Sequence, residues 1–501
     1  MKTITEKYEE KISFSLSSYD RLIITGHLPD ISYAKGMTAY LNKIGVKIFD
    51  YAHFAEPYRG KIRQHIESKS KASGVPIEFI GKSKIRKESL VSEKLKTRGT
   101  GLGIVCILSA MEGCNTYKPW HDKNTGKTFL KSDKSQCLHY YVYFIDKDLG
   151  FGYIRIPTWC PFRLQIYING HNLLAKELDK ANIGYTMIDN AFDSIANPEV
   201  AQKLSDGLDV KKIHRAFDRL AWEYCPVYKD LNLRYQWNVM QAEYAMDIVF
   251  KHQQDLQEIY GELVATAIHT VKPDNISSFW GQKLSPRYQG EVGNNYNVRI
   301  EGSRIKHIKG SNSIKMYDKF HKILRIETTT NNISDFKHYR EVVHRDGTKS
   351  YQDAPFKKNI YSLSDLSGLL KAVNKRYLEF ISVFDNKEVG RKNLMKISES
   401  KTQNNRNYKG FNFFCEKDLH PLLTILRAEF YISGFRNKDL KSFLNLSSSQ
   451  ISRLIKRLRI HGLIKRVGKS YKYYLTVLGK NTIIMAQKIK EIVLVPAYDC
   501  L

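Results

Sequence analysis

The chain has 501 residues, and its 80 Lys and Arg against 51 Asp and Glu give a formal net charge of +29. Hydrophobic residues make up 42% and charged residues 26% of the sequence, a balance typical of globular proteins that excludes disordered and fibrous classes. No apolar run reaches the length of a membrane span, and the first residues do not form a signal peptide. We therefore expect a cytoplasmic protein with no membrane partner. The positive charge indicates nucleic acid first and an anionic membrane surface second, and nucleic acid is the preferred partner.

Several common site motifs are missing. The seven cysteines form no CxxC pair and show no zinc-ligand spacing, which favours buried free thiols. No Walker A loop, no GxGxxG and no HExxH occurs. The paired histidines that bind metal in one large class of nicking enzymes are also missing.

Residues 1–100 predict a mixed α/β region. Helices are expected at 33–44 and 58–70, and a short strand at 77–80. Residues 81–100 are basic with helical spacing in their middle. They suit either a phosphate-binding helix or a solvated one, and the solvated helix is preferred.

Residues 101–190 predict strands separated by turn signals, followed by a helix. The strands are expected at 104–110, 138–146, 152–157 and 163–168, with a turn-rich excursion at 120–135. A helix at 171–183 precedes a strand at 185–189. Asp146 and Asp189 end strands, where either catalytic acids or turn-forming residues occur.

The next segment turns helical, with apolar spacing at 198–208, 210–224 and 253–270. Residues 235–250 fit either a strand or a helix. In a helix, Glu243 and Asp247 would share one face, where they would bind a metal or simply face solvent.

Three strands are expected in series at 297–307, 313–318 and 323–329, and the rest of the chain is interpreted around them. An odd-length loop between the last two puts Met316 opposite Ile326 and Lys315 opposite Glu327. A bulge at Gly302 would keep the first strand in the same pattern. The sheet would then have one apolar face and one polar face.

The polar face concentrates carboxylates, a phenol and cations. Carboxylates among cations suit a divalent metal, Mg²⁺ or Mn²⁺, that faces a phosphodiester. The candidate metal ligands are Glu301, Asp318 and Glu327, and the candidate catalytic residues are Tyr317, Lys315, Lys319 and Arg325. Arg304 and Lys306 are candidates for binding nucleic acid. An ordinary solvated face carries the same residue types, and that alternative has equal weight.

The run GSNSIKMYDKFHKILRIETT resembles the strand-turn-strand signature of plasmid rolling-circle replication initiation factors. The resemblance rests on a Gly-Ser-x-Ser start, then Tyr-Asp-Lys, then Arg-x-Glu, at residues 310–329. It implies an endonuclease that nicks one DNA strand with a tyrosine and a divalent metal. It does not assign the nucleophile to one tyrosine. The chain as a whole also resembles a widespread set of bacterial proteins, which adds no chemistry.

The C-terminal part predicts a separate module. A helix at 365–384 and a polar linker at 385–409 precede helices at 419–431, 437–444 and 450–461, then a hairpin turning at 468–470 and a helix at 481–492. Asn437 and the serines at 447–449 are the expected helix caps. This order resembles the winged helix-turn-helix domain of MarR-type regulators, which implies DNA binding. The expected contact residues are Arg453, Lys456, Arg457, Arg459, Lys465, Arg466, Lys469 and Lys472.

Together these features predict an α+β fold with an antiparallel sheet flanked by helices and a C-terminal winged helix. The expected domains are 1–100, 101–384 and 410–501. Three functions stay open: a metal-dependent nicking enzyme, a MarR-like regulator without catalysis, and a protein that binds structured RNA. DNA is favoured over RNA, and the final helix suits a homodimer or intramolecular packing.

Overall fold

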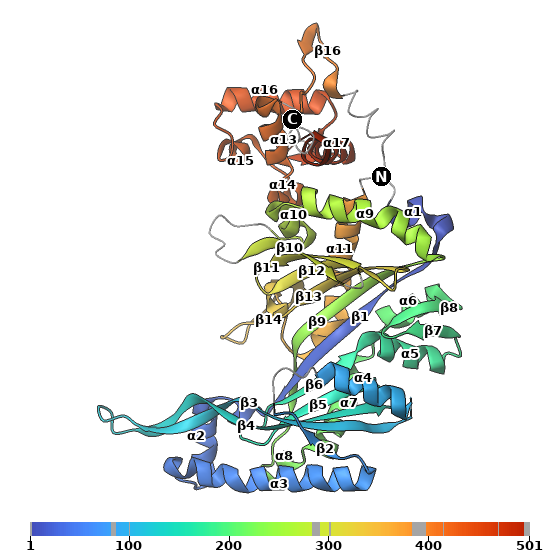
Figure 1. The fold of residues 1–501 in the computed structure, drawn as a ribbon. Helices are drawn as coiled ribbons and strands as arrows, with labels where there is room; N and C mark the ends of the chain where they lie inside the picture. The colour runs from blue at the N-terminus through green and yellow to red at the C-terminus, as the bar shows by residue number, and fades with distance from the viewer. Residues whose placement is uncertain are drawn as a thin grey trace. The chain divides into compact units, whose positions relative to one another are not determined.

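The computed structural model describes residues 3–81, 87–99, 101–282, 291–299, 302–382, 397–413, 415–468 and 470–494. The chain forms a mixed α/β protein whose largest sheet is flanked by helices (Figure 1). It divides into two compact units. The first comprises Met1–Leu16, Ala245–Thr329 and Leu369–Leu501, and the second comprises Ser17–Tyr244 and Thr330–Gly368. Over the described ranges, no helix combines the length and apolar character needed to cross a bilayer.

Among the described residues, the main sheet has eleven strands in the order β10-β11-β12-β13-β9-β1-β6-β5-β4-β3-β2. It is mixed rather than purely antiparallel, because β2 (Ile77–Phe79) pairs in parallel with β3 (Gly103–His121). The chain connects these two strands through helix α4 (Lys87–Arg98), and a helical crossover of this kind returns the chain in the same direction. The sequence analysis missed this arrangement.

Two long strands, β1 (Ile12–His27) and β9 (Gln236–Phe250), are neighbours in the middle of this order. The sequence analysis predicted no strand at 12–27. Its residues 16–20 are all buried, so β1 lacks the alternation that marks a half-exposed strand. Residues 235–250, left open above, form a strand. Glu243 and Asp247 still share a face, because side chains four apart also coincide in a strand.

In the second unit, helices pack on both faces of β4 (Thr128–Asp146) and its neighbours β3, β5 (Gly150–Pro157) and β6 (Leu164–Asn169). Val91 of α4 belongs to one apolar cluster with Tyr141 and Tyr143. On the opposite side, Tyr224 of α7 (Val210–Tyr224) stacks on Phe144 with ring centroids 6.4 Å apart. The excursion expected at 120–135 is instead the outer part of a long β3–β4 hairpin, visible in Figure 1, whose turn covers residues 122–127.

Four other predicted elements of the second unit lie close to their predicted places: α2 (Ala34–Lys43), α5 (Gly170–Lys180), α6 (Pro198–Asp206) and β7 (Tyr185–Ile188). The helix predicted at 58–70 is longer and forms α3 (Tyr51–Ser73). Three strands were not predicted: β8 (Ala191–Ile195), which pairs with β7, and β14 (Lys337–Val343), which pairs with β15 (Lys349–Pro355). Asp146 accepts hydrogen bonds from the backbone N–H groups of Asp148 and Leu149 and pairs with Arg219, so it forms a turn. Asp189 also lies in a turn, with a positive φ of 54°.

The first unit contains β10 (Val292–Arg299), β11 (Gly302–Lys309), β12 (Asn312–Lys319) and β13 (Ile323–Thr330). The single strand predicted at 297–307 is wrong, because Arg299 pairs with Gly302 and the chain reverses there instead of bulging. The last two strands are confirmed. Their loop, residues 320–322, has the expected odd length, and its Phe320 and His321 have positive φ angles of 57° and 58°.

The apolar face of these strands is fully covered, since Met316 and Ile326 are both 0% exposed. The strands pack with α9 (Gln253–Thr270), α10 (Pro273–Phe279) and α11 (Leu363–Ile381). His307 of β11 lies with Nε2 3.0 Å from the hydroxyl of Tyr377 on α11, and Phe279 of α10 meets the same tyrosine edge-on. Burial lowers the pKa of His307 to about 3, so this imidazole is neutral.

The C-terminal segment has the order α13 (Glu416–Ile425), α14 (Ala428–Ser433), α15 (Asn437–Lys441), α16 (Ser448–Ile460), β18 (Ile464–Arg466), β19 (Tyr473–Leu475) and α17 (Val477–Lys488). The helix predicted at 419–431 is therefore two helices. Within the predicted linker, β16 (Lys401–Gln403) pairs with β17 (Arg406–Tyr408), whereas residues 385–396 lie outside the described ranges. The predicted domain boundaries stay predictions.

Caps fix the start of α16. Ser447 Oγ accepts from the backbone N–H of Gln450 at 3.3 Å, and Gln450 Oε1 accepts from the backbone N–H of Ser447 at 2.8 Å. This capping box satisfies two otherwise unpaired donors. Asn437 is not the N-cap of α15, since Arg436 occupies that position. The Asn437 amide instead donates to the carbonyl oxygen of Ser448 at 3.0 Å and joins α15 to α16.

Candidate metal centre

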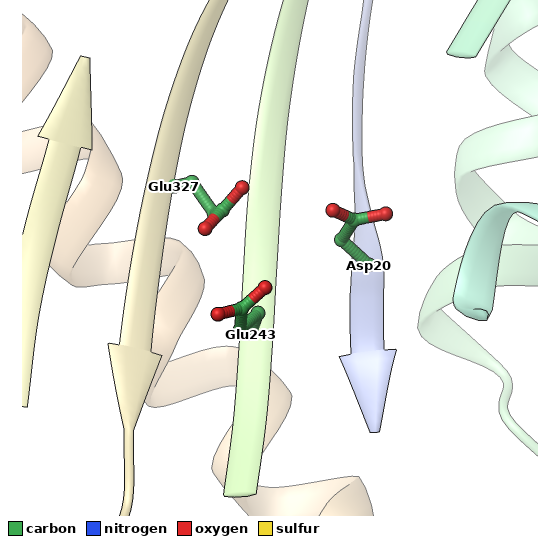
Figure 2. A group of neighbouring side chains, drawn as sticks. All are labelled: Asp20, Glu243 and Glu327. Atoms are coloured by element: carbon green, nitrogen blue, oxygen red, sulfur yellow. The ribbon is translucent and has the colours of Figure 1, made fainter. Parts of the chain in front are cut away.

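Three carboxylates from neighbouring strands gather at one place on the main sheet. Asp20 lies on β1, Glu243 on β9 and Glu327 on β13, and these strands follow one another in the sheet. One oxygen from each lies within 4.8 Å of the others, and Figure 2 shows the three side chains converging. Asp20 and Glu327 are only 6% and 3% exposed. Three negative charges so close together need neutralisation, because burial makes an uncompensated carboxylate costly.

Asp20 is held by polar side chains of the second unit. Its Oδ1 accepts from the amides of Asn169 and Asn190, each at 2.9 Å, and lies 3.2 Å from Nδ1 of His171. Asn169 also caps α5, since its side-chain oxygen accepts from the backbone N–H groups of His171 and Asn172. The end of β6 and the start of α5 therefore fix the position of this carboxylate.

Glu327 has two partners on β12. Lys315 places its Nζ 2.5 Å from Oε1, and Tyr317 donates its hydroxyl to Oε2 at 2.9 Å. This confirms that Lys315 faces Glu327, as the hairpin register predicted. Sequence analysis thus placed Lys315, Tyr317 and Glu327 together on one face, and their contacts agree with that placement.

Arg325 does not face the cluster as a free cation. Its Nε and Nη2 each lie 2.6 Å from an oxygen of Asp247, and the side chains of Arg325 and Asp247 are 0% and 2% exposed. The proposed catalytic role of Arg325 is therefore wrong, since its guanidinium is enclosed in an ion pair. The alternation of residues correctly placed Arg325 on the polar face of β13. It did not indicate that this face is buried there.

Asp318, another predicted metal ligand, does not join the cluster. Asp318 accepts from the backbone N–H of His321 at 3.0 Å and lies 3.1 Å from that imidazole, so it stabilises the β12–β13 loop. Lys319, the last residue of β12, places its Nζ 5.2 Å from the centroid of the Phe320 ring. Glu301 lies outside the described residues.

The two cations predicted on β11 do lie alongside the group. Arg304 is opposite Tyr317 and Lys306 is opposite Lys315 in the β11–β12 ladder. Directly opposite residues share a face of an antiparallel pair. The polar face therefore continues across three strands, although the antiparallel pairing of β10 with β11, and not a bulge, precedes this alignment.

The predicted contact residues of the C-terminal segment divide into two groups. Exposed positions are Arg453, Lys456, Arg459, Lys465 and Arg466, Lys472 is half-buried, and Lys469 lies outside the described residues. Arg457 points elsewhere: it donates to Asp418 and to the carbonyl oxygens of Lys409 and Gly410, and lies 3.9 Å over the Phe411 ring. Its assignment to an outer face is wrong, because it joins α16 to the chain before α13.

The carboxylate cluster has the donor chemistry of a divalent cation site. Hard cations such as Mg²⁺ and Mn²⁺ prefer carboxylate oxygens, and Asp20, Glu243 and Glu327 supply three. Burial would lower the pKa of the nearby Arg21 guanidinium, but Tyr167, Glu243 and Asp20 outweigh burial and raise the pKa. Arg21 stays charged and relieves part of the repulsion.

Sequence reasoning missed Asp20 and grouped Glu243 with Asp247 instead of with Glu327. Asp20 belongs to a strand that was not predicted and lies far from Glu327 in sequence, so no local motif connects them. The helix-or-strand ambiguity of 235–250 hid the pairing of β9 with β13. Comparison of the chain with protein-family models, with curated proteins and with solved structures finds no match.

Proposed function

We propose that this protein nicks one strand of DNA with a divalent metal and a tyrosine nucleophile. The observation that carries the proposal is the Tyr317 hydroxyl, which donates at 2.9 Å to Glu327, a member of the three-carboxylate cluster. A phenol beside carboxylates that attract a divalent cation suits attack on phosphorus. The net charge of +29 favours a polyanionic substrate.

Each residue at this site has a distinct role in the proposal. Asp20, Glu243 and Glu327 would hold Mg²⁺ or Mn²⁺, which neutralises phosphate charge when bound. Lys315 pairs with Glu327, and its ammonium group would also offset the charge of the substrate phosphate. Arg304 and Lys306, on the neighbouring strand, would hold flanking phosphates. The Arg325–Asp247 pair positions β13 against β9 and contacts no substrate.

The proposed step is a transesterification. The Tyr317 oxygen forms a bond to phosphorus, and its proton passes to the carboxylate of Glu327 that already accepts it. The bond between phosphorus and the 3′ oxygen breaks, and this oxygen takes a proton from water. The products are a 5′-phosphotyrosine link and a free 3′ hydroxyl, so the reaction needs no oxidant or second substrate.

We propose in addition that the C-terminal segment is a winged helix that binds duplex DNA. Support comes from the order α15, α16, β18 and β19, which has a short helix, a capped basic helix and a hairpin. Arg453, Lys456 and Arg459 recur every third residue along α16 and are exposed. This spacing places them on one side of the helix, where a phosphate backbone would meet all three.

A regulator without catalysis is the second candidate. The observation that favours it is the direct Lys315–Glu327 pair, which already neutralises one carboxylate of the cluster. A salt-bridged face of this kind would support binding with no chemistry. Structured RNA in place of DNA is a further outcome that the same experiment distinguishes.

The deciding experiment incubates the full chain with supercoiled plasmid, single-stranded DNA, duplex DNA and structured RNA, with Mg²⁺, with Mn²⁺ and with a chelator. We expect metal-dependent nicking and a covalent protein–DNA adduct. Tyr317→Phe should abolish the adduct, whereas Tyr339→Phe should not, because Tyr339 is exposed on β14 in the other unit. Glu243→Gln should abolish calorimetric binding of Mn²⁺. DNA binding without Mn²⁺ binding or cleavage would favour the regulator.

A further inference from the structure

A cavity of about 450 Å³ opens on the second unit, away from the carboxylate cluster. Residues of β3, β4, β5 and β6 line it, together with the loop before β6, Thr25 of β1 and Met240 of β9. Asp20, Glu243 and Glu327 do not line it. Its volume lies within the range of about 300–1,000 Å³ that is typical of small-molecule sites.

The charge on the cavity wall has one sign. Lys134, Arg155 and Arg163 line it, and none of the described lining residues is acidic. Arg155 is paired with Glu112, which does not line the cavity and which accepts hydrogen bonds from Nε at 3.1 Å and from Nη2 at 2.8 Å. Lys134 and Arg163 are exposed, and neither forms an ion pair with any described residue. Two uncompensated cations at the rim of a concave site attract an anion.

His139 adds a hydrogen-bond acceptor to the wall. The residue is 1% exposed and lines the cavity. Burial, and then the charge of Arg155, lowers its pKa to about 4, so the imidazole is neutral at physiological pH. Its Nδ1 lies 3.0 Å from the carbonyl oxygen of Cys137, which places the proton on Nδ1 and makes Nε2 the acceptor nitrogen, with Cys137 Sγ 4.0 Å from it.

The remaining wall suits a flat ring. Trp159 is fixed by the hydrogen bond from its indole N–H to Thr116 Oγ1 at 2.8 Å, and Met240 is 51% exposed at the cavity. The side-chain amides of Asn115 and Gln165 supply donors and acceptors. Apolar surface with a few amide groups is the usual environment of a nucleobase.

We propose that this cavity binds a nucleotide, with its phosphate at Lys134 and Arg163 and its base against Trp159 and Met240. The same chemistry is presented by a free nucleotide and by an unstacked nucleotide unit of a single strand. The cavity shares no residue with the metal centre, so nucleotide binding here can be tested independently of the proposed nicking activity.

Calorimetry with the full chain tests the assignment. The ligands are the nucleoside 5′-monophosphates, ribose 5-phosphate, inorganic phosphate and a short single-stranded oligonucleotide, all without metal. We expect the nucleotides to bind at least about tenfold more tightly than inorganic phosphate, because the ring adds contacts. Binding of the free nucleotides indicates a free ligand, whereas binding of the oligonucleotide alone indicates a unit within a strand.

A matched pair of variants locates the site. Lys134→Ala/Arg163→Ala should weaken nucleotide or oligonucleotide binding by about tenfold or more for each lost charge-assisted bond. Lys123→Ala/Lys127→Ala removes the same charge from the tip of the β3–β4 hairpin and should change binding less than about threefold. Equal affinity for phosphate and nucleotides, unchanged binding in the first variant, or no binding of any ligand would overturn the proposal.

Discussion

Arg325 and Asp247 form an ion pair through two parallel hydrogen bonds of 2.6 Å each, with both side chains closed to solvent. The two residues lie on β13 and β9, which are neighbours in the sheet. The free-energy cost of removing two charges from water is offset only if the charges stay paired. The two parallel hydrogen bonds of this pair provide that geometry. This pair accounts for the arginine of the Arg-x-Glu pattern as a structural group beside the carboxylates.

Asp247→Asn should therefore destabilise the first unit by about 3–5 kcal/mol, since it leaves a buried guanidinium without its counter-charge. Chemical denaturation would measure the change in the free energy of unfolding. The double change Arg325→Met/Asp247→Leu should recover most of the loss, because it removes both charges. Lys349→Ala, which breaks an exposed pair with Glu341, serves as the control and should cost less than about 1 kcal/mol. An equal effect of Asp247→Asn and the control would contradict the buried pair.

Met316→Asp should unfold the first unit or make the protein insoluble. Met316 is 0% exposed on the apolar face of β12, and an aspartate there would bury an unpaired charge. Glu327→Gln changes the opposite face and keeps the acceptor for Tyr317, so it should leave the folded structure intact. Thermal melts followed by circular dichroism would compare the two variants. Similar losses of stability would show that the β12–β13 register is wrong.

The basic residues of α16 should separate into contact residues and structural residues. Arg453→Ala/Lys456→Ala should weaken duplex DNA binding and reduce the salt slope by roughly two, since each lost phosphate contact lowers it by about one. These side chains are exposed, so the melting temperature should stay nearly unchanged. Fluorescence anisotropy at several salt concentrations would measure the slope.

Arg457→Ala should behave in the opposite way. Its guanidinium holds Asp418 and two backbone carbonyl oxygens, so the change should lower stability by about 1–3 kcal/mol without a matching change in salt slope. A lower slope at unchanged stability would place Arg457 at the DNA instead.

The free energy of unfolding of the first unit should change with pH between about 7 and 10.5, because Lys488 is buried. Burial, and then the charge of Lys7, lowers its pKa from 10.5 to about 7. Between these two values the unfolded chain binds a proton that the folded chain does not, so stability should rise with pH by at most ~1.4 kcal/mol per unit. Below pH about 7 both states are protonated and this contribution to the slope vanishes. Lys488→Met should remove the slope in urea titrations between these values, and a slope equal to that of the wild type would contradict the burial of this ammonium group.

The elements with regular patterns were predictable from the sequence. The bounds predicted for α7 and α9 match the structure because their apolar residues follow helical spacing without interruption. The β12–β13 hairpin followed from alternation and loop length. The strand β1 was not predictable, because residues buried on both faces do not alternate. The reversal after Arg299 was mistaken for a bulge, since Gly302 suits either.

Some residues of the candidate site could be grouped from local sequence, and others could not. Lys315, Tyr317 and Glu327 come from one hairpin, so register alone brings them together. Asp20 and Glu243 reach Glu327 only because β1, β9 and β13 are adjacent in the sheet. Strand order between distant segments depends on the packing of the whole sheet, and no spacing rule supplies it. The buried state of Arg325 was hidden for the same reason.

The division of the chain also determines when each unit can be completed during synthesis. The first unit takes its segments from the beginning, the middle and the end of the sequence, whereas the second needs nothing beyond Gly368. A ribosome therefore releases every residue of the second unit before the first has received Tyr377, whose hydroxyl contacts His307. Until then, β11 lacks the part of its cover that α11 supplies, and incompletely covered strands are exposed to aggregation. A premature stop after residue 368 would leave the strand that carries Glu327 in an incompletely folded unit.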